Sequence, residues 1–199
     1  MQTTESLIYI REDFVRLWRD EYITIKKGWV SHRKISKQLN YNTRLIDLCE
    51  KNYGIYAWAP EFANVHSTFP YEEKPIVVKG EIWPHSEGYF QAMKSFGNKE
   101  WNHVRSKIRQ SDPMMCWSIG QSCRLRPDWE NIKDEVMMEA LRSKFKDPFL
   151  ENLLLSTGGM PIVQLKQCPY WGSGKYGNGK NMLGVLLQKL RKEIKYKKI

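Results

Sequence analysis

The sequence predicts an α+β fold that is predominantly helical, with a short β-hairpin, a small sheet and a helical extension at the N-terminus. Residues 128–145 repeat apolar side chains at the spacing of one helical face, with acids early and bases late as the helix dipole prefers. Residues 75–83 read PIVVKGEIW, and two short apolar runs around Lys79 and Gly80 are typical of a hairpin. A chain of 199 residues can bury one good core and a small added segment.

The N-terminal part is expected to be helical. Residues 11–22 place their apolar side chains on one face of a helix, with charges elsewhere. Residues 32–49 predict two short helices around a polar turn, which fits either a helix-turn-helix or an ordinary helical hairpin. We assign residues 1–52 to this extension and residues 53–199 to the main domain.

The main domain is expected to alternate helices with short strands. After the hairpin, a helix begins with Ser86 as its expected cap and Glu87 in its first turn. A helix at 149–155, a short strand at 161–165 and a glycine-rich loop follow the long helix. The last helix is expected from about Asn181.

The charge of the chain is strongly positive and unevenly distributed. The formal net charge is +10, and residues 22–46 and 152–192 each contain six Lys or Arg residues and no acid. Such patches suit partners that carry phosphates, nucleic acid above all, although a basic surface can also serve solubility alone. We therefore expect DNA as a partner. The residues expected to contact it are Lys26, Lys27, Arg33, Lys34, Lys175 and Lys180.

Membrane and metal chemistry are not indicated by the sequence. No apolar run approaches the roughly 18 residues of a membrane span, and the N-terminus lacks the pattern of a signal peptide, so we expect a cytoplasmic protein. Cys49, Cys116, Cys123 and Cys168 lack the CxxC spacing of a zinc site. No metal or other cofactor is expected, and the sequence does not indicate an oligomeric state.

The glycine-rich loop comes within one residue of a phosphate-binding P-loop. Residues 174–180 have the spacing G-x-x-x-x-G-K, but Asn181 stands where that motif needs a Ser or Thr hydroxyl for magnesium. The basic residues that follow offer no acidic second strand for the metal, so the P-loop interpretation fails. We still expect a glycine-rich turn at a helix N-terminus to present backbone N–H groups to an anion, with Trp171 stacking on a flat base.

The helix that begins near Ser86 carries a second group of chemically useful side chains. Glu87, Gln91 and Lys94 are spaced i, i+4 and i+7 and share one face. A carboxylate, an amide and an amine on one stripe can supply a base, a positioning hydrogen bond and a cation or nucleophile. Taken alone, the same pattern also fits a solvated helix face.

Several motifs occur together in a fixed order along the chain. They are PHSEGYFQAMKSF at 84–96, RPDWENIKDEVM at 126–137, TGG at 157–159, YWGSG at 170–174 and GNGKNMLGVLLQKLR at 177–191. In order and spacing they resemble the NADAR (YbiA-like) family of N-glycosidases. The likeness runs from about Trp58 to Arg191, and FANV at 62–65 is similar to the family's opening F-S-N-F.

This resemblance implies hydrolysis of an N-glycosidic bond between ribose C1′ and a base or amine nitrogen. Family members act on ADP-ribose attached to guanine in DNA, or on phosphoribosylamino-pyrimidines of riboflavin synthesis. The implied catalytic residues are Glu87 and Lys94. The implied substrate-binding residues, which would hold a nucleotide or ADP-ribose moiety, are Asn64, Gln91, Trp171, Gly172, Ser173, Gly179 and Asn181.

The sequence departs from the family pattern at three positions. Gly88 replaces a usual His, Gln164 a usual Glu and Ser173 a usual Asp. The last two changes remove carboxylates from the implied pocket, which bears on the substrate more than on the fold.

The implied chemistry suits the residues that remain. Loss of a base from C1′ develops positive charge on the sugar, which the carboxylate of Glu87 can stabilise while it orients water. A position in the first turn of a helix favours the ionised form of this carboxylate. As the alternative, Lys94 attacks C1′ and holds the opened sugar as a Schiff base.

Three functions are therefore in competition. The first is an N-glycosidase, resembling a DNA glycosylase, for a modified or ADP-ribosylated base carried on nucleic acid, in phage defence or DNA repair; an unstacked base would need an aromatic partner such as Trp171. The second is the same chemistry on a small phosphoribosylamino-pyrimidine of riboflavin synthesis. The third is a nucleotide- or nucleic-acid-binding protein without catalysis.

Overall fold

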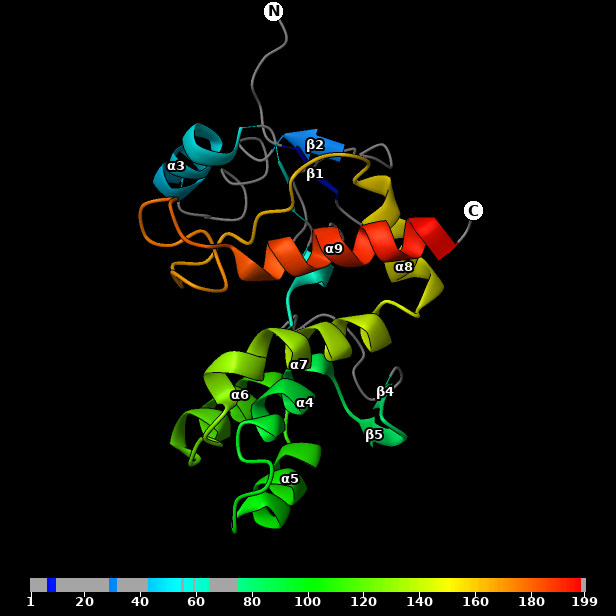
Figure 1. Cartoon of the computed structure of the whole chain (residues 1–199). Helices are drawn as coiled ribbons and strands as arrows, with labels where there is room; N and C mark the ends of the chain where they lie inside the picture. The colour runs from blue at the N-terminus through cyan, green and yellow to red at the C-terminus, as the bar shows by residue number, and fades with distance from the viewer. Residues whose placement is uncertain are drawn as a thin grey trace, which may run out of the picture. The chain divides into compact units, whose positions relative to one another are not determined.

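The structure is a computed structural model of the chain, which divides into two compact units (Figure 1). The first unit contains residues 1–62 and 152–199, and the second contains residues 63–151. The chain therefore leaves the first unit once and returns to it. The structure describes residues 7–9, 29–31, 43–54, 56–58, 60–64 and 75–197.

The first unit contains a small three-stranded sheet with the order β2-β1-β3. Strand β1 (Leu7–Tyr9) pairs antiparallel with β2 (Trp29–Ser31) and parallel with β3 (Ala57–Trp58). In this register Ile8 lies opposite both Val30 and Trp58. Residues 7–9 are thereby built into the same sheet as residues 57 and 58.

Residues 161–165, expected as a strand, form a single bridge between Ile162 and Ala57. The main-chain N–H of Ala57 donates to Pro161 O at 2.7 Å, and that of Val163 donates to Ala57 O at 3.1 Å. Beyond this bridge the main chain of the segment binds the following loop instead, because Gln164 O accepts from Ser173 N. This expectation was therefore wrong in extent.

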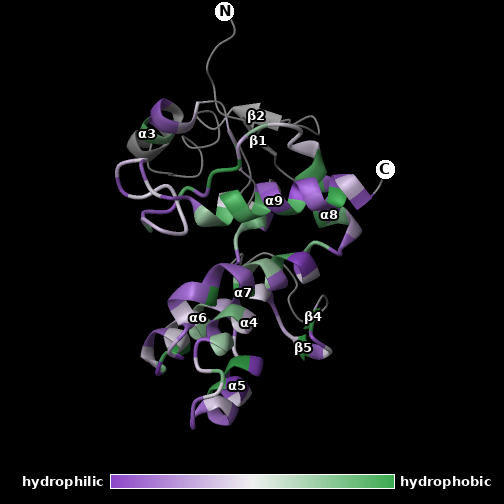
Figure 2. Ribbon diagram, in the orientation of Figure 1, coloured by the Kyte–Doolittle hydropathy of each residue, from purple (hydrophilic) through white to green (hydrophobic). Residues whose placement is uncertain are grey.

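Helices cover the rest of the first unit. Helix α9 (Met182–Lys197) begins within a residue of the expected start, and α8 (Pro148–Ser156) matches the expected helix at 149–155. Both helices carry apolar residues among their polar ones (Figure 2). Helix α9 buries Leu183, Leu186, Leu187 and Leu190.

Helix α3 (Thr43–Tyr53) covers the second half of the two short helices expected at 32–49. Cys49 on this helix packs with Tyr56 and Val163 in a small buried cluster. The described parts of the N-terminal extension are therefore two strands and most of α3, rather than helix throughout. The helix expected at 11–22 and the residues at 32–42 lie outside the described residues.

The second unit begins with the expected hairpin of β4 (Ile76–Val78) and β5 (Glu81–Trp83). Lys79 and Gly80 both have positive φ, 52° and 79°, as a two-residue turn between antiparallel strands requires. Ile76 and Val78 are buried and Val77 is exposed, so one face of the hairpin joins the core.

Helix α4 (Ser86–Met93) lies at the centre of the second unit, and every residue of it is buried. It packs against α5 (Trp101–Arg109), α6 (Pro113–Ser122) and α7 (Trp129–Lys144), as Figure 1 shows. Helix α7 confirms the long helix expected at 128–145. Among the described helices, none combines the length and the apolar character needed to cross a membrane.

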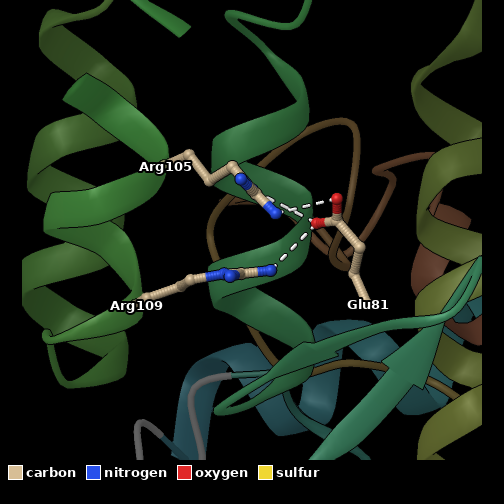
Figure 3. Close-up of polar contacts among 3 residues, drawn as sticks. All are labelled: Glu81, Arg105 and Arg109. Carbon is tan, nitrogen blue, oxygen red and sulfur yellow. Dashed lines mark hydrogen bonds and ion pairs between the residues drawn. The ribbon is translucent and has the colours of Figure 1, made fainter. Parts of the chain in front are cut away.

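An ion cluster joins the hairpin to α5 (Figure 3). Arg105 NH2 lies 2.8 Å from Glu81 Oε1, and Arg109 NH2 donates to Glu81 Oε2 at 2.9 Å. The guanidinium of Arg109 also lies over the Trp83 ring, 4.9 Å from its centroid. Both oxygens of this carboxylate are therefore bound within the protein.

The contact of α9 with residues 161–165 predicts the effect of a small substitution. A Cβ at Gly184 would lie 2.0 Å from Ile162 O and 2.4 Å from Asn181 Nδ2, so Gly184→Ala forces the backbone apart. We expect this change to lower the free energy of unfolding by about 1–3 kcal/mol, measured by urea denaturation. Gly159→Ala is the matched control, because a Cβ there meets nothing within 4 Å. Equal midpoints for the two variants would contradict the packing described.

Candidate active site

His85 caps α4 and so fixes where the helix begins. Its backbone is extended, and its Nδ1 accepts a hydrogen bond from Gly88 N at 2.8 Å, which places the cap one residue before the expected Ser86. The Nε2–H then donates to Ser111 O at 3.1 Å. Burial lowers the pKa of His85, which keeps the ring neutral and Nδ1 able to accept.

Gly88 fits closely against this capping ring. A Cβ at position 88 would lie 3.1 Å from His85 Cε1 and 3.3 Å from Ile108 Cγ2. Gly88 stands where the family usually has His, and the neighbouring side chains pack closely against it. No open space is left at this position.

The stripe on α4 is buried, so it is not a solvated helix face. Glu87, Gln91 and Lys94 are 6%, 3% and 9% exposed. Gln91 Nε2 donates to Glu87 Oε1 at 2.6 Å, which holds the carboxylate in position. The structure thus brings the two expected catalytic residues and one expected binding residue together.

Helix α6 meets this stripe through Gly120. A Cβ at Gly120 would lie 1.9 Å from Gln91 Oε1, so the amide of Gln91 occupies the space that a side chain would fill. The carbonyl of Gly120 accepts from Lys94 Nζ at 3.3 Å. The sequence analysis missed this residue; its one signal was a glycine inside a helix, where it costs about 1 kcal/mol relative to alanine.

The amine of Lys94 lies in an environment that favours its neutral form. Burial lowers the pKa of Lys94, and the nearby Cys123 and Glu87 oppose this shift in part. The Nζ atom lies 6.0 Å from the centroid of the Phe90 ring. A buried amine with a lowered pKa is the form of lysine that acts as a nucleophile.

The motif RPDW holds the C-terminal end of α4. The main-chain N–H of Arg126 donates to Lys94 O at 2.6 Å. The Arg126 side chain binds Asp128 through Nε at 2.5 Å and NH2 at 2.9 Å, and this pairing lowers the pKa of Asp128. The ring of Trp129 packs on Phe90, with centroids 5.0 Å apart. A motif on which the family resemblance rests therefore holds the end of the helix that carries the stripe, without belonging to the stripe itself.

Asn64, an expected binding residue, lies in the second unit against α7. Its Nδ2 lies 2.9 Å from the Sδ atom of Met137, and the residue is 5% exposed. Within the described part of the chain, Asn64 Oδ1 has no hydrogen-bond partner.

The other expected binding residues lie on the glycine-rich loop of the first unit. Main-chain bonds hold the loop together, with Gly179 N donating to Ser173 O at 2.7 Å and Asn181 N to Gly172 O at 3.0 Å. A Cβ at Gly172 would lie 2.6 Å from Lys166 O, and one at Gly179 would lie 2.4 Å from Gly172 O. The glycines allow the main chain to cross itself at close range.

The expectation that this turn offers its N–H groups to an anion is wrong for residues 180–183. Lys180 N donates to Pro169 O at 2.8 Å, and Met182 N and Leu183 N donate to Tyr170 O and Trp171 O at 3.0 and 3.2 Å. These N–H groups stand at the start of α9, where an anion would bind. They are instead used to close the loop.

The side chain of Asn181 connects the glycine-rich loop to residues 161–165, which form the bridge with Ala57. Its Oδ1 accepts from Gln164 N at 2.9 Å, and its Nδ2 donates to Ile162 O at 2.7 Å. Asn181 has a φ of 51°, in the left-handed region that Asn tolerates better than most residues. Its amide therefore holds the main chain in place.

The two positions that lack a carboxylate are both buried. Gln164 is 4% exposed, and within the described residues its Oε1 has no hydrogen-bond partner. Ser173 is fully buried, and its Oγ lies 3.3 Å from Lys166 O. Neutral groups thus stand at both positions.

Aromatic and basic side chains share the outside of the loop. Trp171 is half-buried and meets Tyr170 edge to face at 5.1 Å between centroids. Lys180 lies over the Tyr170 ring at 5.2 Å, and Lys175 over Tyr176 at 5.4 Å. Both lysines are exposed, as contact with DNA would require. The other expected DNA contacts, Lys26, Lys27, Arg33 and Lys34, lie outside the described residues.

Comparison with known proteins gives consistent matches. The model of the NADAR domain matches residues 53–195. The N-glycosidase YbiA of Escherichia coli (strain K12) is 42% identical over 128 residues, which are 62% of this chain and 78% of that protein. The riboflavin biosynthesis protein PYRR, chloroplastic, of Zea mays is 37% identical over 123 residues, 56% of this chain and 20% of that protein. The NMR structure of E. coli YbiA has a TM-score of 0.57 at 39% identity, covering 69% of this chain and 79% of that one.

The helical α+β fold, the buried stripe of α4 and these relatives define an enzyme that hydrolyses N-glycosyl bonds. The chain belongs to the NADAR family. The family and the enzyme class expected from the sequence are thereby confirmed.

The neutral cap of α4 predicts a dependence of stability on pH. The unfolded state binds a proton near the ordinary His pKa of 6.5, whereas His85 in the fold binds it only at lower pH. The contribution of His85 to the free energy of unfolding is therefore fully present above about pH 6.5. It is lost as the pH falls through the pKa that His85 has in the folded state. His85→Asn keeps a capping oxygen that does not titrate, so its unfolding midpoint should fall less between pH 7.5 and 5. An equal decline in both proteins would exclude His85 as the cause.

Proposed function

We propose that this enzyme cleaves the bond between ribose C1′ and the nitrogen of a modified or ADP-ribosylated base carried on nucleic acid. The observation that carries the proposal is the buried group on α4, in which Gln91 holds the carboxylate of Glu87 beside the amine of Lys94. A carboxylate and an amine with a lowered pKa are two groups that glycosidic cleavage can use directly.

Glu87 acts on the charge that develops at the sugar. As the C1′–N bond breaks, the ribose becomes oxocarbenium-like, and a fixed carboxylate stabilises it. Water then adds its hydroxyl to C1′, and its proton is transferred to the departing nitrogen. The hydrogen bond from Gln91 Nε2 keeps Glu87 oriented, and the first turn of α4 favours its negative charge.

Lys94 offers a covalent route on the same stripe. Its Nζ would attack C1′, expel the base with a proton and open the ribose to an imine, which water then hydrolyses. The lowered pKa of Lys94 supports this route, because the neutral amine is the nucleophile.

Charge and exposure support a polyanionic substrate. In the acid-free stretch 152–192 all five lysines are exposed, while Arg191 is buried and donates to Thr157 Oγ1 and Met160 O. Gln164 and Ser173 add no negative charge to the loop of the first unit. A positive surface and exposed aromatic rings are the usual means of holding a nucleic-acid strand.

A second candidate substrate is a small phosphoribosylamino-pyrimidine. The observation that favours it is the match to a protein named for riboflavin biosynthesis. The bond broken would be the same, and Glu87 and Lys94 would keep their roles. The non-catalytic alternative is not retained, because the relatives include a named N-glycosidase and the buried stripe is intact.

Glu87→Gln tests the carboxylate. The amide keeps the size of the side chain and its acceptor for Gln91, so we expect an unchanged fold. Turnover should fall by about two to four orders of magnitude, the range for a lost acid–base group, when release of base from ADP-ribosylated DNA is followed by chromatography. Near-normal turnover would remove Glu87 from the catalytic role.

Lys94→Arg tests the covalent route. With borohydride present during turnover, the parent should become linked to the opened sugar of the substrate, and the variant should not, because arginine keeps a long hydrogen-bond donor but remains charged and is a poor nucleophile. Mass spectrometry of the intact protein detects the adduct. An active parent that gives no adduct would favour direct attack by water.

Charge reversal separates the two substrates. Lys175→Glu with Lys180→Glu should weaken binding to any duplex by a similar factor and reduce the salt dependence of its affinity by about two phosphate contacts. Hydrolysis of a free nucleotide fragment should be nearly unchanged. Lys99→Glu with Lys107→Glu is the control, since these exposed lysines lie in the second unit and carry the same charge change. If both pairs behave alike, the metabolite becomes the leading substrate.

A parallel variant examines the N-terminal patch. Lys26, Lys27, Arg33 and Lys34 are all changed to Glu, and DNA binding and cleavage are measured from about 50 to 200 mM salt. Loss of DNA binding without loss of activity on the free fragment is expected. Behaviour equal to the parent would show that this stretch takes no part in binding.

A further inference from the structure

A pocket lies in the second unit, on the opposite face of α4 from the catalytic stripe. It has a volume of about 390 Å³ and is lined by residues of the hairpin, α4, α7 and the segment around Phe96 and Trp101. On α4 its wall is formed by Tyr89 and Met93, whereas the stripe uses Glu87 and Gln91. Its size falls in the range of sites that take a small ligand.

Four aromatic rings form much of the pocket wall. Trp83 meets Tyr89 edge to face at 5.5 Å between centroids and lies tilted against Trp101 at 6.4 Å. Phe96 meets Trp101 edge to face at 5.1 Å and is 45% exposed. Trp83 and Tyr89 are buried, so Phe96 and the partly exposed Trp101 are the rings of this wall that a flat ligand in the pocket can reach.

Most charges around the pocket are already paired. Both oxygens of Glu81 are taken by arginines of α5 (Figure 3). Glu139 is bound by the hydroxyl of Tyr89 and by Lys79 Nζ at 2.7 Å. None of these groups is available to a ligand without the loss of an existing contact.

Two polar groups of the lining keep unused capacity. Glu135 is exposed, and it has no ion pair within the part of the chain that the structure describes. Arg126 binds Asp128 through Nε and NH2, and its guanidinium lies over the Phe96 ring, 5.3 Å from the centroid. Its other terminal nitrogen has no hydrogen-bond partner among the same residues. The pocket thus offers one strong acceptor and one donor beside aromatic walls.

These features select one class of ligand. A cation would bind Glu135 but leave the free terminal nitrogen of Arg126 without an acceptor, and a hydrocarbon would leave both groups unused. We propose that this pocket binds a nucleobase with an exocyclic amino group, which stacks on Phe96 or Trp101 and donates to Glu135. Adenine, guanine and cytosine fit this description, and uracil does not.

The proposal goes beyond the hydrolytic reaction, because the pocket contains neither Glu87 nor Lys94. It gives the enzyme a second place for a base, apart from the one where the glycosidic bond is broken. It does not require the substrate to be nucleic acid, so the two proposals can fail independently.

Protein-observed NMR of the full chain tests the pocket directly. Adenosine, guanosine, cytidine, uridine and choline are each titrated against the protein with labelled methyl groups. The three nucleosides with amino groups should shift the methyl signals of Met93, Ile132 and Val136, which line the pocket. Uridine should shift them less, and choline should not shift them.

Variants connect any shift to the proposed contacts. Phe96→Ala should weaken nucleoside binding by about 5- to 100-fold, the range for loss of one base stack. Glu135→Gln should reduce the preference for amino-bearing bases over uridine. Tyr196→Ala is the control, since Tyr196 is an exposed aromatic residue at the end of α9, in the first unit. Glu87→Gln should bind like the parent, which separates this pocket from catalysis.

Three outcomes would overturn the proposal. They are the absence of shifts at millimolar nucleoside, shifts produced by choline alone, and nucleoside binding that Phe96→Ala leaves unchanged. Loss of hydrolysis in Glu87→Gln together with intact nucleoside binding would support both proposals at once. Hydrolysis without nucleoside shifts would retain the enzyme and remove this pocket.

Discussion

The burial of a carboxylate and an amine on one helix is the constraint on which the second unit depends. Removing such groups from water is costly unless hydrogen bonds replace the water, by several kcal/mol for each charge. Here Gln91 binds Glu87, Gly120 O accepts from Lys94, and the main chain of Arg126 fixes the last turn. Helices α5, α6 and α7 pack against α4, and the low dielectric of this enclosure strengthens these hydrogen bonds. The lowered pKa of Lys94 is a direct result of that enclosure.

Much of this arrangement follows from local patterns in the sequence. Three features could be predicted from the sequence, because each depends on residues that lie close together in the chain. They are the turn at Lys79 and Gly80, the long amphipathic helix α7, and the spacing of Glu87 and Lys94. These local patterns could not predict which side chains are buried, because burial depends on segments that are far apart in the sequence. The contact between Gln91 and Gly120 is such a case, since nothing near either residue indicates the other. Strand β1 has three residues, too few to show an alternating pattern.

The glycine-rich loop shows that a motif can preserve packing as well as chemistry. From the sequence, the glycine-rich turn before Asn181 suggested an anion site, since that is a common use of glycines before a helix. In the structure the amide of Asn181 and the N–H groups of Met182 and Leu183 bind other parts of the main chain. Periodicity and residue type cannot distinguish these uses, because both require small residues and a positive φ. The two uses differ in what accepts the hydrogen bonds of these N–H groups, which is a main-chain carbonyl here and would be a bound anion in an anion site.

The missing side chain at Gly120 also sets the register between two helices. Helix α6 has no second glycine, and a displacement by one turn, about 5.4 Å, would bring Cys116 opposite the amide of Gln91. The side chain of Cys116 would then occupy the space that the amide fills, so the contact at Gly120 favours one position of α6 along α4. Helix α6 carries no acid or base of the reaction. Its alignment with α4 is nevertheless set by the absence of one atom, the Cβ at Gly120.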